Sequence, residues 1–170
     1  ESFGFKISKR NMQPVYKLYY DLDSKEEELM ALMKKNTRYN IRLAEKKGVV
    51  INEYSLNDPK IDQKILQFYD LLLITKQRAR GYPIRSFEYF KAFIKNFSPL
   101  DNISLFEATY LGKTIAMNIS QRTKNWSSSF YAASNRLYPE VKAPYLLRWR
   151  SIQKAKEYGS KLYDFWGIVP

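Results

Sequence analysis

Cysteine and histidine are both absent from this chain of 170 residues. Without cysteine there is no disulfide framework and no thiolate zinc site, which favours a reducing, cytoplasmic environment. Without histidine there is no side chain that ordinarily titrates near neutral pH, so Ser–His–Asp and Cys–His nucleophile systems are excluded within the chain. We therefore expect a domain that binds and positions its substrates, with no metal and no cofactor.

Long apolar runs are missing as well. The longest aliphatic block, residues 71–74, is far shorter than the roughly 20 residues that span a bilayer, and residues 1–20 lack the pattern of a signal peptide. The chain begins without Met and ends directly after a strand-like segment. We therefore expect it to be a piece of a longer protein.

Positive charge and aromatic rings are what the chain has in excess. Lys and Arg number 29 against 17 Asp and Glu, a net charge of +12, which predicts attraction to the phosphates of nucleic acid, of a nucleotide sugar or of an anionic membrane face. A basic surface that serves only solubility is the alternative. Aromatic residues make up 16% of the chain, so we expect a ring-rich core or pocket.

Capping and periodicity signals divide the N-terminal part of the chain. Residues 13–22 are β-branched and aromatic and predict a strand. Ser24 and Glu27 have the capping-box spacing, so we expect one long helix over residues 25–47 that ends at Gly48.

The rest of the chain alternates between helical and strand periods. Ser86 is the expected N-cap of a helix with phenylalanines along one face. Further helices are expected at residues 60–76 and 145–158, and strands at residues 49–54, 103–110, 114–120, 127–133 and 162–165. The last helix joins two strands as a βαβ unit, so these two strands should run parallel. The order predicts an α/β fold with a GNAT-like (acyl-CoA N-acyltransferase-like) mixed central sheet flanked by helices, and ligands near the strand ends at residues 133–135 and 164–167.

A row of cations lies on the expected helix over residues 25–47. It consists of Lys34, Lys35, Arg38, Arg42 and Lys46. Like charges four residues apart on a helix repel each other unless an anion neutralises them, which favours contact with a phosphate backbone. A solvated helix face is an equally weighted alternative.

Four further side chains stand where helices and sheets bind ligands. Arg85 comes just before a helix start, where free N–H groups favour anions, and Tyr89 follows one turn later. Alternatively, Arg85 is an ordinary surface residue and Tyr89 an ordinary core residue. Tyr131 lies on a central strand and either meets a buried partner or faces a cleft. Asp164, at the end of the last strand, either belongs to a site or caps a loop.

One loop that acyl-CoA enzymes use is missing. Residues 136–143, between a strand and the last helix, contain no glycine, so backbone amides cannot crowd around a pyrophosphate there. The chain has no P-loop motif either.

Five segments carry a resemblance to a known family. They are TRYNIRLAEKKG at 37–48, RSFEYF at 85–90, YAAS at 131–134, PYLLRW at 144–149 and YDFWG at 163–167. In this order they resemble the FemABX family, the aminoacyl-tRNA-dependent peptidyltransferases that build the interpeptide bridge of bacterial peptidoglycan.

The resemblance implies transfer of an amino acid from its tRNA ester to an amine on the stem peptide of a peptidoglycan precursor. The implied partners are aminoacyl-tRNA and either UDP-MurNAc-pentapeptide or lipid II, in a bacterial cytoplasm with peripheral contact at the inner membrane face. Residues 1–23 would end a preceding acyltransferase-like domain, and residues 24–170 would be a second GNAT-like domain, truncated at its C-terminal end. We expect the fragment alone to be inactive.

The resemblance also implies roles for single residues. Arg85 would hold the phosphates of the precursor. Tyr89, Tyr131 and Asp164 would line the precursor site. Contacts with tRNA or with precursor phosphates would come from Lys34, Lys35, Arg38 and Arg42. No catalytic residue is assigned.

Two other functions stay open on the residues alone. One is an acyl-CoA-dependent N-acyltransferase, which the glycine-free loop disfavours. The other is a non-catalytic basic module that binds RNA, another anion or a membrane. The family pattern D-x-G-G also reads D-F-W-G at residues 164–167, so the bulky Trp166 departs from it.

Overall fold

The chain folds into one mixed sheet with helices on both faces. The computed structural model describes residues 16–79, 83–97 and 102–167. In chain order the elements are β1 (Lys17–Asp21), α1 (Glu26–Leu32), α2 (Lys35–Lys46), β2 (Val50–Ser55), α3 (Ile61–Arg78), α4 (Phe87–Phe97), β3 (Ile103–Tyr110), β4 (Lys113–Arg122), β5 (Trp126–Ser134), a 3₁₀ turn (Pro139–Val141), α5 (Ala143–Glu157) and β6 (Leu162–Gly167).

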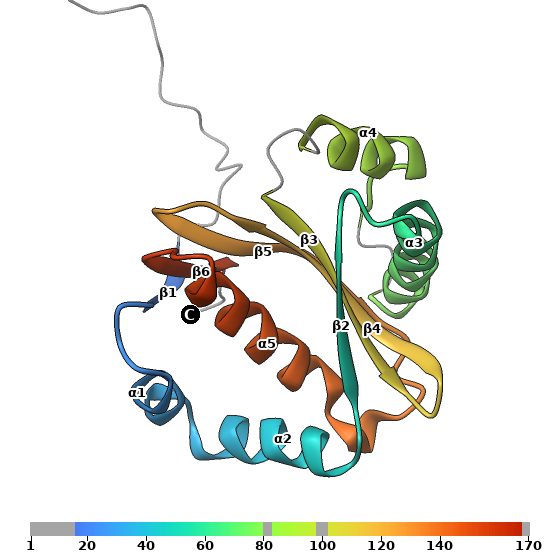
Figure 1. Ribbon diagram of the computed structural model, residues 1–170. Coiled ribbons are helices and arrows are strands. Elements are labelled where there is room, and N and C mark those ends of the chain that lie inside the picture. The colour runs from blue at the N-terminus through green and yellow to red at the C-terminus, as the bar shows by residue number, and fades with distance from the viewer. Residues whose placement is uncertain (1–15, 80–82, 98–101, 168–170) are drawn as a thin grey trace, which may run out of the picture.

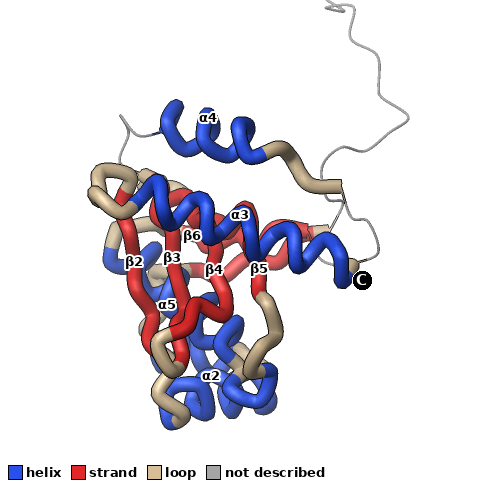
Figure 2. The backbone as a smooth tube through the Cα atoms, turned by 90° about the vertical axis from the view of Figure 1, so that its right-hand side faces the viewer, coloured by secondary structure: helices blue, strands red, loops and turns tan. Residues whose placement is uncertain are grey.

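The six strands lie in the order β1-β6-β5-β4-β3-β2. Helices α3 and α4 cover one face, and α1, α2 and α5 lie on the other (Figures 1 and 2). The predicted α/β, GNAT-like mixed sheet flanked by helices is therefore confirmed. Most elements lie within a few residues of their predicted ranges; of the strand predicted over 13–22, residues 13–15 lie outside the described residues.

At strand β5 the pairing within the sheet changes from antiparallel to parallel, and the parallel pairing is short. It runs parallel to β6, as the βαβ unit predicts, but this pairing covers only Trp126–Ser128 against Leu162–Asp164. Beyond it β5 continues beside β4 alone among the described strands. The register of β5 with β4 also shifts, which leaves Phe130 as the extra residue of a β-bulge.

A separate hydrophobic core fills each face of the sheet. The core beneath α5 includes Trp149 and Tyr163, and the core beneath α3 and α4 includes Phe68 and Phe90, whose rings meet edge-on at 5.7 Å. Because helices cover both faces, residues 115–120 of β4 are buried on both sides of the strand.

The single long helix predicted over residues 25–47 is wrong, because the segment forms two helices. Met33 and Lys34 between α1 and α2 have extended ψ angles of 148° and 144°. Arg38, in the first turn of α2, donates from Nη1 to the carbonyl oxygens of Ala31 and Met33, which have no partner within α1. The helical periodicity of the sequence continues through this break and therefore hides it.

Helix starts follow the predicted cap in one case and miss it in another. The Oγ of Ser86 accepts the N–H three residues later at 3.2 Å, so Ser86 caps α4 as predicted. The predicted capping box of Ser24 and Glu27 is wrong by one residue. The N–H of Lys25 donates to Oε2 of Glu28 at 3.0 Å instead, because Lys25 has the extended N-cap backbone.

Candidate functional site

Three of the predicted site residues, Arg85, Tyr89 and Tyr131, lie together on the α4 side of the sheet. The guanidinium carbon of Arg85 is 5.5 Å from the centre of the Tyr89 ring, a cation–π distance. The hydroxyls of Tyr89 and Tyr131 are 3.4 Å apart. Tyr89 is 39% exposed, so this group, which we call the Arg85 cluster, presents a guanidinium and two phenols close to solvent.

A row of aromatic rings in contact with one another extends the Arg85 cluster along the sheet. Phe93 stacks on Tyr89 with centroids 6.1 Å apart, and it meets both Phe130 and Tyr131 edge-on. Phe130 in turn contacts Trp166 at 5.7 Å. Phe130 and Tyr131 are neighbours in sequence but reach the same ring because of the β-bulge. Strand alternation places neighbours on opposite faces, so Phe130 was not predicted.

Asp164 is buried, and both of its carboxylate oxygens have partners. Its Oδ2 accepts from Nζ of Lys17 at 3.2 Å, and its Oδ1 accepts the N–H of Trp166 at 2.7 Å. The hydrogen bond to Asp164 raises the pKa of Lys17. Trp166 has a left-handed φ of 64°, which glycine adopts without strain. The contacts of Asp164 are those of a loop cap, one of the two readings that its position in the sequence allows.

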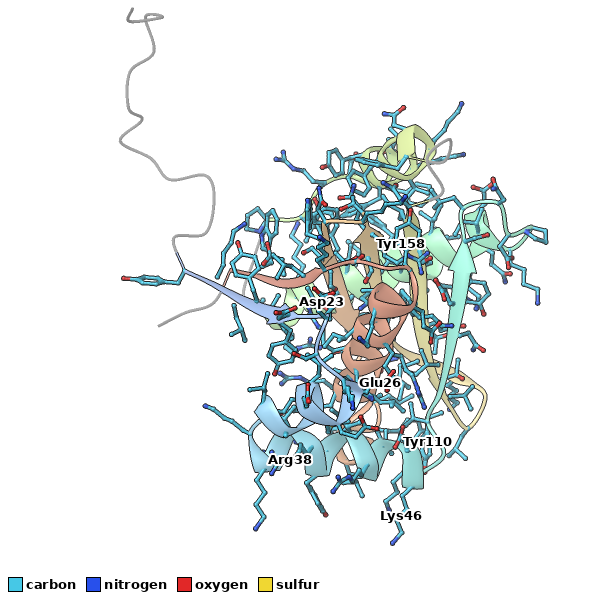
Figure 3. All side chains as sticks on the ribbon, turned by 60° about the vertical axis from the view of Figure 1, so that its left-hand side comes forward. Asp23, Glu26, Arg38, Lys46, Tyr110 and Tyr158 are labelled. Atoms are coloured by element: carbon cyan, nitrogen blue, oxygen red, sulfur yellow. The ribbon has the colours of Figure 1, made fainter. Side chains whose placement is uncertain are left out.

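Helix α2 turns most of its predicted cations toward solvent (Figure 3). The exposed cations are Lys34, Lys35, Arg42 and Lys46. Tyr39 among them is 60% exposed, so a ring is available beside the charges. Arg38 differs, because its guanidinium binds carbonyls of α1 and the residue is half-buried. The face can therefore attract an anion without Arg38.

A cavity of about 470 Å³ lies where the glycine-free loop meets the N-terminus of α5. Arg136 and Lys142 line it, and both have left-handed φ angles, 55° and 56°. These two residues take the conformation that glycines would otherwise supply. The described lining of this cavity contains no carboxylate, so the positive charge of Arg136 and Lys142 suits an anion.

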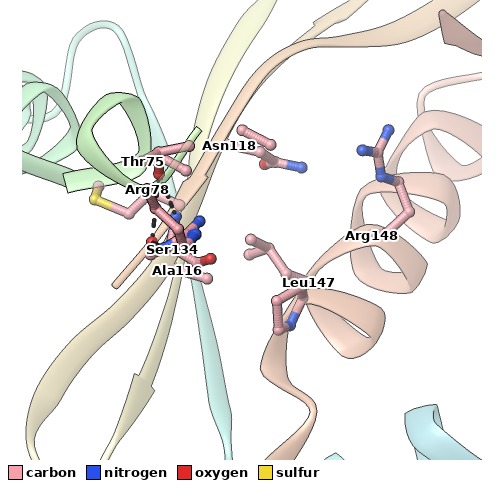
Figure 4. Close-up of a pocket in the computed structure, with 11 residues that line it drawn as sticks. Thr75, Arg78, Ala116, Asn118, Ser134, Leu147 and Arg148 are labelled. Carbon is pink, nitrogen blue, oxygen red and sulfur yellow. Dashed lines mark hydrogen bonds between the residues drawn. The ribbon is translucent and has the colours of Figure 1, made fainter. Parts of the chain in front are cut away.

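A smaller cavity of about 130 Å³ lies between the ends of β4 and β5 and the helices α3 and α5 (Figure 4). Arg148 of α5 and Asn118 of β4 face each other across it (Figure 4). On another side, Arg78 donates from Nη1 to the carbonyl of Ser134 at 2.9 Å, and burial lowers the pKa of Arg78. Ser134 belongs to the strand end, residues 133–135, near which ligands were expected, but Arg78, Asn118 and Arg148 were not predicted as site residues. An asparagine within a buried strand was the signal for Asn118.

An apolar cavity of about 240 Å³ adjoins the smaller one between α2 and α5, and Pro144 and Arg148 line both.

The residues that the structure describes hold no group of three or more metal-ligating side chains. Within the same ranges, no helix has the length and apolar character needed to cross a bilayer.

The mixed sheet, with its one parallel pair opening beside α5, defines a GNAT-like domain. A model of the FemAB family matches residues 3–111 of the sequence. The chain belongs to the FemAB family, a family of transferases. No curated protein sequence matches the chain.

Solved structures share this fold. The crystal structure of FemX matches with a TM-score of 0.83 and 17% identity over 97% of this chain and 56% of FemX. The C-terminal domain of a putative lysylphosphatidylglycerol synthetase from Agrobacterium fabrum matches with a TM-score of 0.64 and 11% identity over 88% of this chain and 45% of that one. L-PGS from Bacillus licheniformis matches with a TM-score of 0.55 and 14% identity, over 91% and 45%. The chain spans about half the length of these structures.

Proposed function

We propose that this chain is part of an aminoacyltransferase that moves an amino acid from aminoacyl-tRNA to the stem peptide of a peptidoglycan precursor. Membership of the FemAB family and the FemX-like fold support the proposal. The observation that carries it is the convergence of Tyr131 with Arg85 and Tyr89, because the strand residue Tyr131 lies far from the other two in sequence and joins them in one cluster.

We further propose that residues 1–23 end a first acyltransferase-like domain and that residues 24–170 form most of the second. Strand β1, within the first of these ranges, pairs with β6 at the sheet edge. A preceding domain would therefore be joined to this sheet directly through a strand. The acceptor is UDP-MurNAc-pentapeptide or lipid II, and a lipid-linked acceptor would bring the enzyme to the inner membrane face.

In this proposal the Arg85 cluster binds the precursor. Arg85 offers a planar fork of donors that suits phosphate oxygens. Tyr89 and Tyr131 provide ring faces and hydroxyls for the sugar and peptide. Asp164 supports the site indirectly, through Lys17 and the turn at Trp166. The tRNA backbone would contact the exposed cations of α2.

The reaction needs positioning more than a protein nucleophile, because an aminoacyl ester is already activated. The acceptor amine attacks the ester carbonyl, the bond to the ribose oxygen breaks, and the amine proton ends on that oxygen. Alignment of the two substrates and a donor for the developing oxyanion supply the catalysis. A chain without histidine and cysteine is compatible with this chemistry.

The test is calorimetry of the full-length protein with UDP-MurNAc-pentapeptide. Loss of a charged hydrogen-bond donor typically costs about 1.5–3 kcal/mol, so Arg85→Ala should weaken binding about 10- to 100-fold. Lys95→Ala, at the other end of the same helix, is the control and should change the Kd less than about twofold. Absence of binding by the wild type, or equal loss in both variants, would contradict the proposal.

Two additional titrations separate the competing functions. Binding of acetyl-CoA that shifts the amide signals of residues 136–143 would favour an acyl-CoA N-acyltransferase. Strong, salt-dependent binding of RNA without affinity for the UDP-sugar peptide would favour a non-catalytic module.

A further inference from the structure

Two side chains that line the cavity of about 130 Å³ each carry a buried polar atom without a partner. Nη1 of Arg148 and Oδ1 of Asn118 make no hydrogen bond with any described residue. Asn118 is 1% exposed, and its Nδ2 donates to Ser129 and Ser151 at 3.3 Å and 2.9 Å, so the orientation of its amide is set. Unsatisfied buried groups are rare and costly in folded proteins. Two of them, from α5 and β4, line the same cavity and point to a polar ligand.

The charge of the cavity selects the kind of ligand. Two guanidiniums, Arg78 and Arg148, line it, and its described lining includes no carboxylate. Arg78 is already bound to the carbonyl of Ser134, so Arg148 is the residue with a donor to offer. Such surroundings favour a carbonyl oxygen or an oxyanion. They also keep a nearby amine in its uncharged, nucleophilic form.

The size of the cavity limits what can enter. A volume of about 130 Å³ is well below the ~300–1,000 Å³ of sites for larger ligands, so it fits a small group and no nucleotide. The cavity of about 470 Å³ shares Ser134 and Pro144 with it and has room and cations for a terminal nucleotide. An ester that joins a small acyl group to a nucleotide matches this pair of cavities.

The cavity also adjoins the predicted acceptor site along strand β5. Tyr131 belongs to the Arg85 cluster, while the next residue, Ala132, lines the cavity. Both lie along β5, and beyond Ser128 that strand has no pairing with β6 among the described residues. An acceptor amine could therefore reach the cavity past the edge of β5.

We propose that Arg148 is a catalytic residue that binds the carbonyl oxygen of the aminoacyl ester in this cavity. The inference rests on the proposed function, because it places the donor ester of that reaction. Arg148 donates to the carbonyl oxygen as the amine attacks, and it stabilises the oxyanion that forms. The bond to the ribose oxygen then breaks, and that oxygen takes the proton from the amine.

The test is amino acid transfer by the full-length protein. The substrates are UDP-MurNAc-pentapeptide and tRNA charged with a mixture of radiolabelled amino acids. Loss of an oxyanion donor typically lowers kcat about 10²- to 10³-fold, so Arg148→Met should lower kcat about 100-fold with the KM for the precursor unchanged. Arg148→Lys keeps the charge without the planar fork of donors, so it should lower kcat less than Arg148→Met does. Arg150→Met is the matched control, because Arg150 is on the same helix, exposed, and paired with Glu45 at 3.1 Å.

The outcomes separate this inference from the proposed function. If Arg148→Met leaves kcat within about twofold of the wild type, the inference is overturned and the proposed function stands. If the wild type transfers no amino acid, both are overturned. If Arg148→Met does not fold, Arg148→Lys decides, and an unchanged kcat in that folded variant overturns the inference. An equal fall in kcat for Arg150→Met would show a general effect of lost positive charge and would also overturn it.

Discussion

Replacement of Lys64 by methionine would leave a buried carboxylate without its counter-ion. Nζ of Lys64 lies 2.8 Å and 2.9 Å from the two carboxylate oxygens of Glu107, and the two side chains are only 12% and 2% exposed. Tyr54 also donates to Glu107, at 2.8 Å, and Thr114 donates to its other oxygen. Methionine keeps most of the volume of lysine and removes only the charged donor.

Removing one partner of a buried ion pair typically costs about 3–5 kcal/mol. Tyr54 and Thr114 still donate to Glu107 in Lys64→Met, so we expect the lower end, a loss of about 3 kcal/mol in the free energy of unfolding at pH 7. This corresponds to a change of roughly 100-fold in the unfolding equilibrium, since each 1.4 kcal/mol is about tenfold.

The penalty should depend on pH. Burial raises the pKa of Glu107, but hydrogen bonds from Lys64, Thr114 and Tyr54 outweigh burial and hold that pKa below its ordinary value. In the wild type, this carboxylate therefore stabilises the fold above the unfolded pKa of about 4.3, and the contribution disappears as pH falls through the folded pKa. Without Lys64 the pKa of Glu107 rises, so Glu107 protonates more readily and the penalty shrinks as pH falls toward about 4.

Urea unfolding at pH 7 and pH 4.5 measures both effects. Lys154→Met is the control, because its ion pair with Glu157 is exposed, and it should cost less than about 0.5 kcal/mol. The double variant Lys64→Met with Glu107→Gln should recover about 1 kcal/mol or more, since it removes the unpaired charge. A loss below about 1 kcal/mol for Lys64→Met, or one that is independent of pH, would refute this reasoning.

Three other variants test local features. Arg38→Ala should lower the free energy of unfolding by about 1–2 kcal/mol, because two carbonyls of α1 lose their donor, whereas Arg42→Ala should change it by less than about 0.5 kcal/mol; equal losses in urea titrations would exclude the cap. Ser86→Ala should lower the free energy of unfolding by about 1 kcal/mol and speed hydrogen exchange at the N–H of Tyr89, which donates to Ser86. Unchanged exchange at this N–H would contradict the prediction. Trp166→Gly should stay within about 1 kcal/mol of the wild type in thermal unfolding, because relief of the left-handed backbone, about 1–2 kcal/mol, offsets the lost ring contacts; a loss above about 3 kcal/mol would show that the contacts dominate.

Local signals predicted most of the elements, and the family resemblance implied that the three residues of the Arg85 cluster share a site. Ser86 predicted the start of α4, and the change from helical to strand periodicity predicted the three consecutive strands β3, β4 and β5. The break between α1 and α2 was missed because the helical periodicity continues through it and because the sequence does not show which role Arg38 has. A cation on a helix face can meet an external anion or cap a neighbouring helix, and only the positions of the carbonyls of Ala31 and Met33 distinguish them.

The sequence by itself determined the absence of thiol and imidazole chemistry, the excess of positive charge and the order of helices and strands, because these follow from residue types and short-range periodicity. Only the tertiary structure decided which side chains meet. The bulge that turns Phe130 toward the Arg85 cluster and the parting of β5 from β6 depend on pairing between distant strands. The same holds for the cavity where Arg148 faces Asn118, because no local pattern encodes which residues of β4 and α5 pack against each other.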